Sequence, residues 1–160
     1  MSVADVESAA ASFGLFVMGA LHEGDETLIL LGAGKDLWPM FTASSEAHDG
    51  DPDPLDRWSK RIINEIADRF DAGACYPSDG PPYQPFIRWA LDSGHFFHSP
   101  TGMMVHSASG LMISIRGALR VAGRWSLPNR PSRRPCEDCS DRPCVSACPV
   151  GALSENAAYD

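Results

Sequence analysis

The pattern of hydrophobic and polar positions predicts short helices and strands in the first part of the chain. Apolar residues recur at helical spacing over residues 3–13, with Ser2 as a candidate N-cap and Gly14 as a stop. Two apolar runs follow, at residues 15–21 and 27–31, separated by a polar turn. Runs of this length bounded by turn residues predict paired, buried strands.

The clearest helix is predicted over residues 54–70. Asp53 is placed as its N-cap, and Pro54 occupies the first helical position, where its missing N–H costs nothing. Apolar side chains at positions 55, 58, 62, 66 and 70 share one face, which is typical of a helix packed on a core. We therefore interpret it as part of the scaffold.

The second half of the chain alternates short apolar runs with loops. Residues 86–91 predict one or two helical turns that end at Asp92-Ser93-Gly94. The runs at residues 103–106 and 111–115, joined by a Ser/Gly turn, predict a β-hairpin. Residues 120–135 are rich in Arg and Pro and lack periodicity, so we expect a connector there.

Length and charge limit the possible functions. The chain has 160 residues, 44% of them hydrophobic, which is enough for one core and a small appendage. We expect an α+β domain over residues 1–127 and a cysteine-bearing segment over residues 128–160. The net charge of -8 disfavours general nucleic-acid binding, which needs a concentrated positive face. No apolar run approaches the ~20 residues of a membrane span, and the N-terminus lacks a basic region, so we expect a cytoplasmic protein with reduced thiols and no membrane partner.

The charge is unevenly distributed along the chain. Residues 1–110 carry sixteen acidic and six basic side chains, whereas residues 111–160 carry five acidic and seven basic ones. The positive skew lies beside the cysteines, where it could offset the charge of a metal cluster or dock an acidic electron donor. A solvated arginine-rich linker explains the same composition.

Four cysteines carry the strongest chemical signal. Cys136, Cys139, Cys144 and Cys148 are spaced x2, x4 and x3, and Pro149 follows the last. Bacterial iron–sulfur segments read C-x2-C-x2-C-x3-C-P, so only the middle spacing is longer here. A zinc site usually separates its two ligand pairs by a dozen or more residues, and a disulfide framework suits a short secreted chain. We therefore predict an iron–sulfur site, with zinc and a metal-free segment as the alternatives.

Residues 136–152 resemble the ferredoxin-type segment of epoxyqueuosine reductase, a cobalamin-dependent iron–sulfur enzyme. The resemblance covers roughly residues 54–152 and, more loosely, the two N-terminal strands. It implies a nitroreductase-like sheet flanked by helices, followed by a small ferredoxin-like segment with a 4Fe-4S cluster. In two-cluster segments the cysteine before the proline binds the other cluster. The chain stops at Asp160 without a second motif. We expect either a truncated piece of a longer protein, which could lack an intact cluster, or convergence of all four cysteines on one centre.

The segment before the cysteines also resembles part of the corrinoid pocket of this reductase and of the cobalamin-trafficking chaperone. By that resemblance Gly102, His106, Gly110 and Arg116 would contact a cofactor, which we expect to be cobalamin, or less readily FMN. Ser107 stands where those relatives have a proline after the histidine.

The same resemblance implies that Asp92 donates a proton to a substrate. The alternative is a purely structural role, in which Asp92 only caps a helix or turn.

Three functions fit these features. The first is an oxidoreductase that passes electrons from its cluster to a bound corrinoid or small-molecule substrate. The second is a ferredoxin-like electron carrier without catalysis of its own, and the third is a metal-stabilised binding domain. The partners we expect are an electron-donor protein or a small molecule, with tRNA entering only by analogy with the reductase.

Overall fold

A four-stranded antiparallel sheet forms the centre of the protein in the computed structural model, which describes residues 1–155. Its strands are ordered β1-β2-β6-β3. They span Leu15–Glu23 (β1), Glu26–Ala33 (β2), Ile115–Ala122 (β6) and Gly73–Cys75 (β3). The described helices are α1 (Val3–Ala11), α2 (Leu37–Thr42), α3 (Pro54–Arg69), α4 (Phe86–Ser93) and α5 (Pro143–Ser146), with a 3-10 turn at Ser45–Ala47. The protein is therefore a mixed α+β fold, as the sequence predicts.

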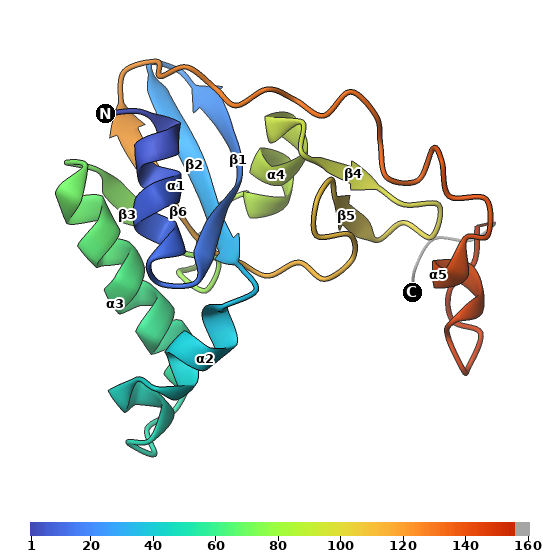
Figure 1. Ribbon diagram of the computed structural model, residues 1–160, viewed down its shortest axis with the longest axis horizontal. Coiled ribbons are helices and arrows are strands. Elements are labelled where there is room, and N and C mark those ends of the chain that lie inside the picture. The colour runs from blue at the N-terminus through green and yellow to red at the C-terminus, as the bar shows by residue number, and fades with distance from the viewer. Residues whose placement is uncertain (156–160) are drawn as a thin grey trace.

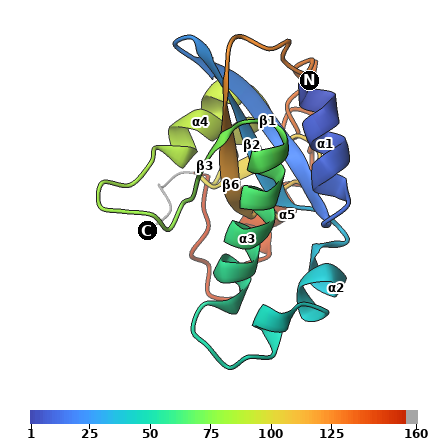
Figure 2. The same cartoon turned by 90° about the vertical axis from the view of Figure 1, so that its left-hand side faces the viewer.

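Helices cover both faces of this sheet (Figure 2). Helices α1 and α3 pack on one face around Ile29 and Leu31, and α4 packs on the other around Leu28 and Leu30. Successive residues of a strand point to opposite faces, so a strand covered on both sides is apolar at every position. This explains why β2 appears in the sequence as a continuous apolar run.

The predicted N-terminal helix, the first two strands and the long helix are confirmed. The hydroxyl of Ser2 accepts a hydrogen bond from the Asp5 amide and so caps α1. Asp53 does not cap α3 with its side chain, because its backbone is in the left-handed region at a φ of 53°. Arg57 instead fixes the preceding loop, since its guanidinium pairs with Asp49 at 2.7 Å.

The predicted β-hairpin is wrong in its pairing. Strand β5 (Met104–His106) pairs with β4 (Phe96–His98) in a separate two-stranded unit, called here the β4–β5 unit. After β5 the backbones of His106 and Gly110 exchange hydrogen bonds of 2.8 and 3.0 Å, which closes a tight turn. Residues 111–114 then leave this unit as coil, and Ile115 begins β6 in the main sheet.

A long connector joins the sheet to the cysteines. It begins at residue 123 rather than at Arg120, because residues 120–122 complete β6. Thr27 anchors its start, donating to the Gly123 oxygen and accepting from the Trp125 amide, each at 2.9 Å. The connector passes over the β4–β5 unit to α5, far from α3 (Figure 1). No helix among residues 1–155 is long and apolar enough to cross a membrane.

Candidate metal centre

Three of the four cysteines line one cavity. Cys136 and Cys139 come from the loop after the connector, and Cys144 lies in α5. The cavity measures about 360 Å³ and is almost wholly apolar. Its opposite wall is formed by residues of the β4–β5 unit and the turn that follows: Ser99, Val105, Gly110 and Leu111. The cysteine segment therefore lies against the β4–β5 unit, which comes earlier in the sequence.

Cys148 lies outside this group of three. Its sulfur accepts a hydrogen bond from the Ala152 amide at 3.3 Å, within the turn that follows α5. Hydrogen bonds from the amides of residues 152 and 150 lower the pKa of the Cys148 thiol, because they stabilise the thiolate. Burial raises the pKa of Cys136, and the neighbouring sulfurs of Cys144 and Cys139 raise it further by repulsion between negative charges.

The chemistry of the three cysteines suits a thiolate-bound metal or cluster. Thiolates are the ligands of iron–sulfur clusters and of soft metals. An apolar wall shields such a centre from water and thereby influences its potential. Within residues 1–155, however, no three His, Cys, Asp or Glu side chains are close enough together to form a ligand set. Binding would therefore require the three sulfur atoms to move closer together.

Local sequence explains how Cys144 is presented. Pro143 occupies the first position of α5, and Arg142 before it is left-handed at a φ of 40°. This turn contains Arg142 and Pro143, the two residues by which the spacing between Cys139 and Cys144 exceeds the x2 of bacterial iron–sulfur segments. Arg142 also pairs with Glu155 at 2.5 Å, which joins the turn before α5 to the residues that follow the last cysteine.

His106, predicted to contact a cofactor, is buried with a relative exposure of 3% and uses both ring nitrogens within the fold. Its Nδ1 accepts from the amides of Ala108 and Ser109, at 3.2 and 3.1 Å. Nε2 must then carry the proton and donate to the Met18 oxygen at 2.8 Å. Burial lowers the pKa of His106, which favours this neutral form. The ring therefore ties the β4–β5 unit to β1.

The other predicted cofactor residues do not gather at one place. Gly110 lines the cysteine cavity, whereas Gly102 lies in the turn between β4 and β5. Arg116 lies on the α3 side of the sheet, paired with the Asp56 carboxylate and bonded to the Ser59 hydroxyl at 3.0 Å.

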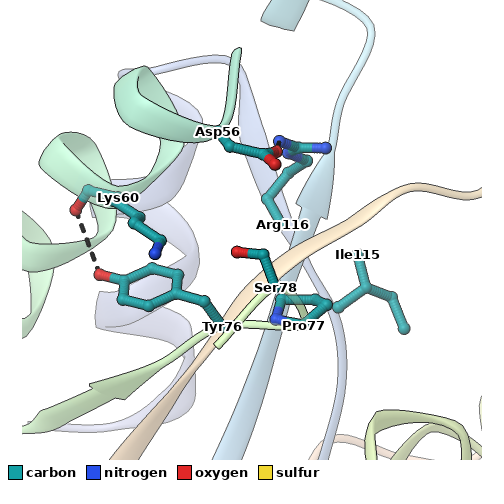
Figure 3. A pocket seen from close by; sticks show the side chains of 7 residues that line it. All are labelled: Asp56, Lys60, Tyr76, Pro77, Ser78, Ile115 and Arg116. Atoms are coloured by element: carbon teal, nitrogen blue, oxygen red, sulfur yellow. Dashed lines mark hydrogen bonds and ion pairs between the residues drawn. The ribbon is translucent and has the colours of Figure 1, made fainter. Parts of the chain in front are cut away.

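Figure 3 shows the small polar recess that Arg116 and Asp56 line, together with Lys60, Tyr76 and Ser78. Its volume is about 70 Å³, too small for a corrinoid or a flavin.

Asp92, the predicted proton donor, lies in the last turn of α4. Its side chain is 52% exposed, and its carboxylate is 3.6 Å from the guanidinium of Arg88. Its backbone oxygen accepts from Arg130 at 3.1 Å. The helix continues through Ser93, two residues beyond the predicted turns, and Gly94 caps its end.

Sequence reasoning did not find the residues that hold the cysteine segment in place. Arg134 lies over the ring of Phe97, 5.6 Å from its centre, and Arg130 packs on Gly94. The apolar side chains of Val105 and Leu111 complete the cysteine cavity. The only signal for them was the excess of arginine before the cysteines, since contacts over such sequence distances leave no local pattern.

No family model matches this sequence, and a search of curated proteins gives no significant match.

Proposed function

We propose that this protein is an iron–sulfur redox protein in which Cys136, Cys139 and Cys144 bind one cluster. The observation that carries the proposal is their position around one apolar cavity, with Cys148 outside it. This division of three and one is the one known from two-cluster ferredoxin segments, in which the cysteine before the proline serves the other cluster. That the cysteine-bearing segment, residues 128–160, is ferredoxin-like is part of the same proposal.

The surrounding residues would protect and orient the centre. Val105 and Leu111 would exclude water from one side of the cluster. The arginines of the connector would lower the electrostatic free energy of a negatively charged cluster. A bound cluster would supply one-electron transfer. The protein's own contribution is to hold the three sulfurs against the β4–β5 unit.

The acceptor of the electrons belongs to the same proposal. The resemblance implies a nitroreductase-like fold and a corrinoid or another small-molecule acceptor, with an electron-donor protein as partner. Gly110 is the predicted cofactor residue that lies beside the cysteines, so an acceptor would be placed on that side. Titration of the reduced protein with hydroxocobalamin and with FMN, followed by absorption, tests this part separately.

Anaerobic isolation with metal analysis tests the central part. We expect iron and acid-labile sulfide in the protein, and an electron paramagnetic resonance signal that appears on reduction with dithionite. Stoichiometric zinc without sulfide would refute the redox function and favour a metal-stabilised domain. A cluster without any spectral response to hydroxocobalamin or FMN would favour an electron carrier.

A further inference from the structure

A second cavity carries two arginines and lies between α4, the β4–β5 unit and the connector. It measures about 440 Å³, a size common for small-molecule sites. Leu91, Gly94, Phe97 and His98 line one side, and Arg130 and Arg134 line the other. Among residues 1–155, no acidic side chain lines this cavity. It is called the arginine cavity below.

The side chain of Arg130 is held in place without an acidic partner. A Cβ placed on Gly94 would approach the Cδ and Nε atoms of Arg130 to 2.7 Å, so the arginine stem packs directly on that glycine. One terminal nitrogen donates to the Asp92 backbone oxygen at 3.1 Å. We find no ion pair of Arg130 with a carboxylate within residues 1–155. A guanidinium has five N–H donors, so most of those of Arg130 are free for a ligand.

Arg134 is positioned by an aromatic ring. Its guanidinium lies over Phe97 at 5.6 Å from the ring centre. Stacking of this kind leaves the in-plane donors of the guanidinium available. Its acidic neighbour, Glu137, is 4.0 Å away at an exposed position, where an ion pair contributes little.

The positive charge of Arg130 also affects the pKa of a neighbouring histidine. Burial is the main reason why the pKa of His95 is lowered, and the charge of Arg130 lowers it further. Two other acidic side chains nearby in sequence pair with arginines outside the cavity: Asp92 faces Arg88 at 3.6 Å, and Asp138 faces Arg133 at 3.0 Å.

We propose that the arginine cavity binds a small organic anion that carries both a phosphate group and a flat ring, of the kind found in a nucleotide. Arg130 and Arg134 present the planar donor pairs that phosphate oxygens accept in bidentate fashion. Phe97 and Leu91 offer an apolar surface to the ring. The proposal does not depend on the cluster, because none of the four cysteines lines this cavity.

Isothermal titration calorimetry with ADP, pyrophosphate and adenosine tests the two halves of the ligand separately. We expect the protein to bind ADP more tightly than pyrophosphate and to bind adenosine weakest. Arg130→Ala and Arg134→Ala should each weaken ADP binding roughly ten- to hundredfold, the value of a hydrogen bond to a charged group. Phe97→Leu should weaken ADP binding more than pyrophosphate binding, because Phe97 both positions Arg134 and offers its surface to the ring of the ligand.

Arg133→Ala is the matched control. Arg133 has the same charge and lies in the same connector, but it pairs with Asp138 and does not line the cavity. Far-UV circular dichroism would show that each variant is folded. No binding of ADP or pyrophosphate at millimolar concentration, or an equal loss in Arg133→Ala, would overturn the proposal. Equal affinities for ADP and pyrophosphate would refute contact with the ring, and equal affinities for ADP and adenosine would refute recognition of the phosphate.

Discussion

Replacing His106 by alanine should destabilise the fold because this ring joins the β4–β5 unit to β1. The substitution leaves the Met18 oxygen, in a fully buried residue, without its donor. An unpaired buried acceptor costs about 1–3 kcal/mol. The ring also makes edge contacts with Phe96 and Phe16, at centre distances of 4.8 and 5.7 Å, and aromatic pairs contribute about 0.5–1.5 kcal/mol. The amides of Ala108 and Ser109 lie near the surface, where water can replace Nδ1, so we expect a total loss of about 2–6 kcal/mol.

Urea unfolding followed by circular dichroism measures this loss. His98→Ala is the matched control, because His98 lies on the neighbouring strand β4 with an exposed side chain. Its unfolding free energy should stay within about 0.5 kcal/mol of the wild type. A His106→Ala variant as stable as His98→Ala would refute the role assigned to the buried ring.

The same variant should change how stability depends on pH. Burial lowers the pKa of His106 below its usual 6.5, so the unfolded chain takes up a proton at higher pH than the folded protein does. The contribution of the neutral ring is complete above pH 6.5 and decreases as the pH falls below that value. The slope can reach about 1.4 kcal/mol per pH unit for one group. His106→Ala should lose this part of the slope and keep the part contributed by His95, whose pKa is also lowered by burial.

Two further predictions concern the core and an ion pair. Trp58→Ala should lower the free energy of unfolding in urea by about 3–5 kcal/mol, because Trp58 is 2% exposed. Cys136→Ser should leave the main unfolding transition unchanged. A collapse of the whole fold in Cys136→Ser would show that the core needs the cysteine segment. The bond from Arg61 to Glu46, at 2.5 Å, lowers the pKa of that carboxyl to about 2, so its stabilisation is present above pH 4.5 and is lost as the pH falls toward 2. Glu46→Gln should therefore be less stable than the wild type at neutral pH, with a difference that shrinks between pH 4.5 and 2 in acid unfolding; a constant difference would contradict the assigned pair.

The elements that the sequence predicts well are those whose signal is local. The α3 helix has an apolar stripe and a proline at its start, and β1 and β2 are apolar runs around a polar turn. The pairing of β5 could not be predicted, because nothing near Val105 marks β4 rather than residues 111–115 as its partner. The extent of β6 was also hidden, since Arg116 and Arg120 interrupt its apolar pattern while pairing with distant carboxylates.

The candidate site shows the same division. The cysteine spacing alone indicated a metal centre, and the structure sets three of these cysteines around one cavity. The roles expected for His106 and Arg116 depended on a resemblance in chain order, which does not determine on which face of a sheet a side chain lies. In the structure His106 is bonded on both nitrogens, and Arg116 faces α3.

Iron content after anaerobic reconstitution of four single Cys→Ser variants tests the proposed centre most directly. We expect Cys136→Ser, Cys139→Ser and Cys144→Ser each to lose most of the iron, sulfide and visible absorption of the wild type. Cys148→Ser should keep the cluster, because Cys148 does not line the shared cavity. A loss in Cys148→Ser equal to that in the other three would show that all four cysteines bind one centre. A wild-type protein that takes up no iron and sulfide would contradict the proposed function itself.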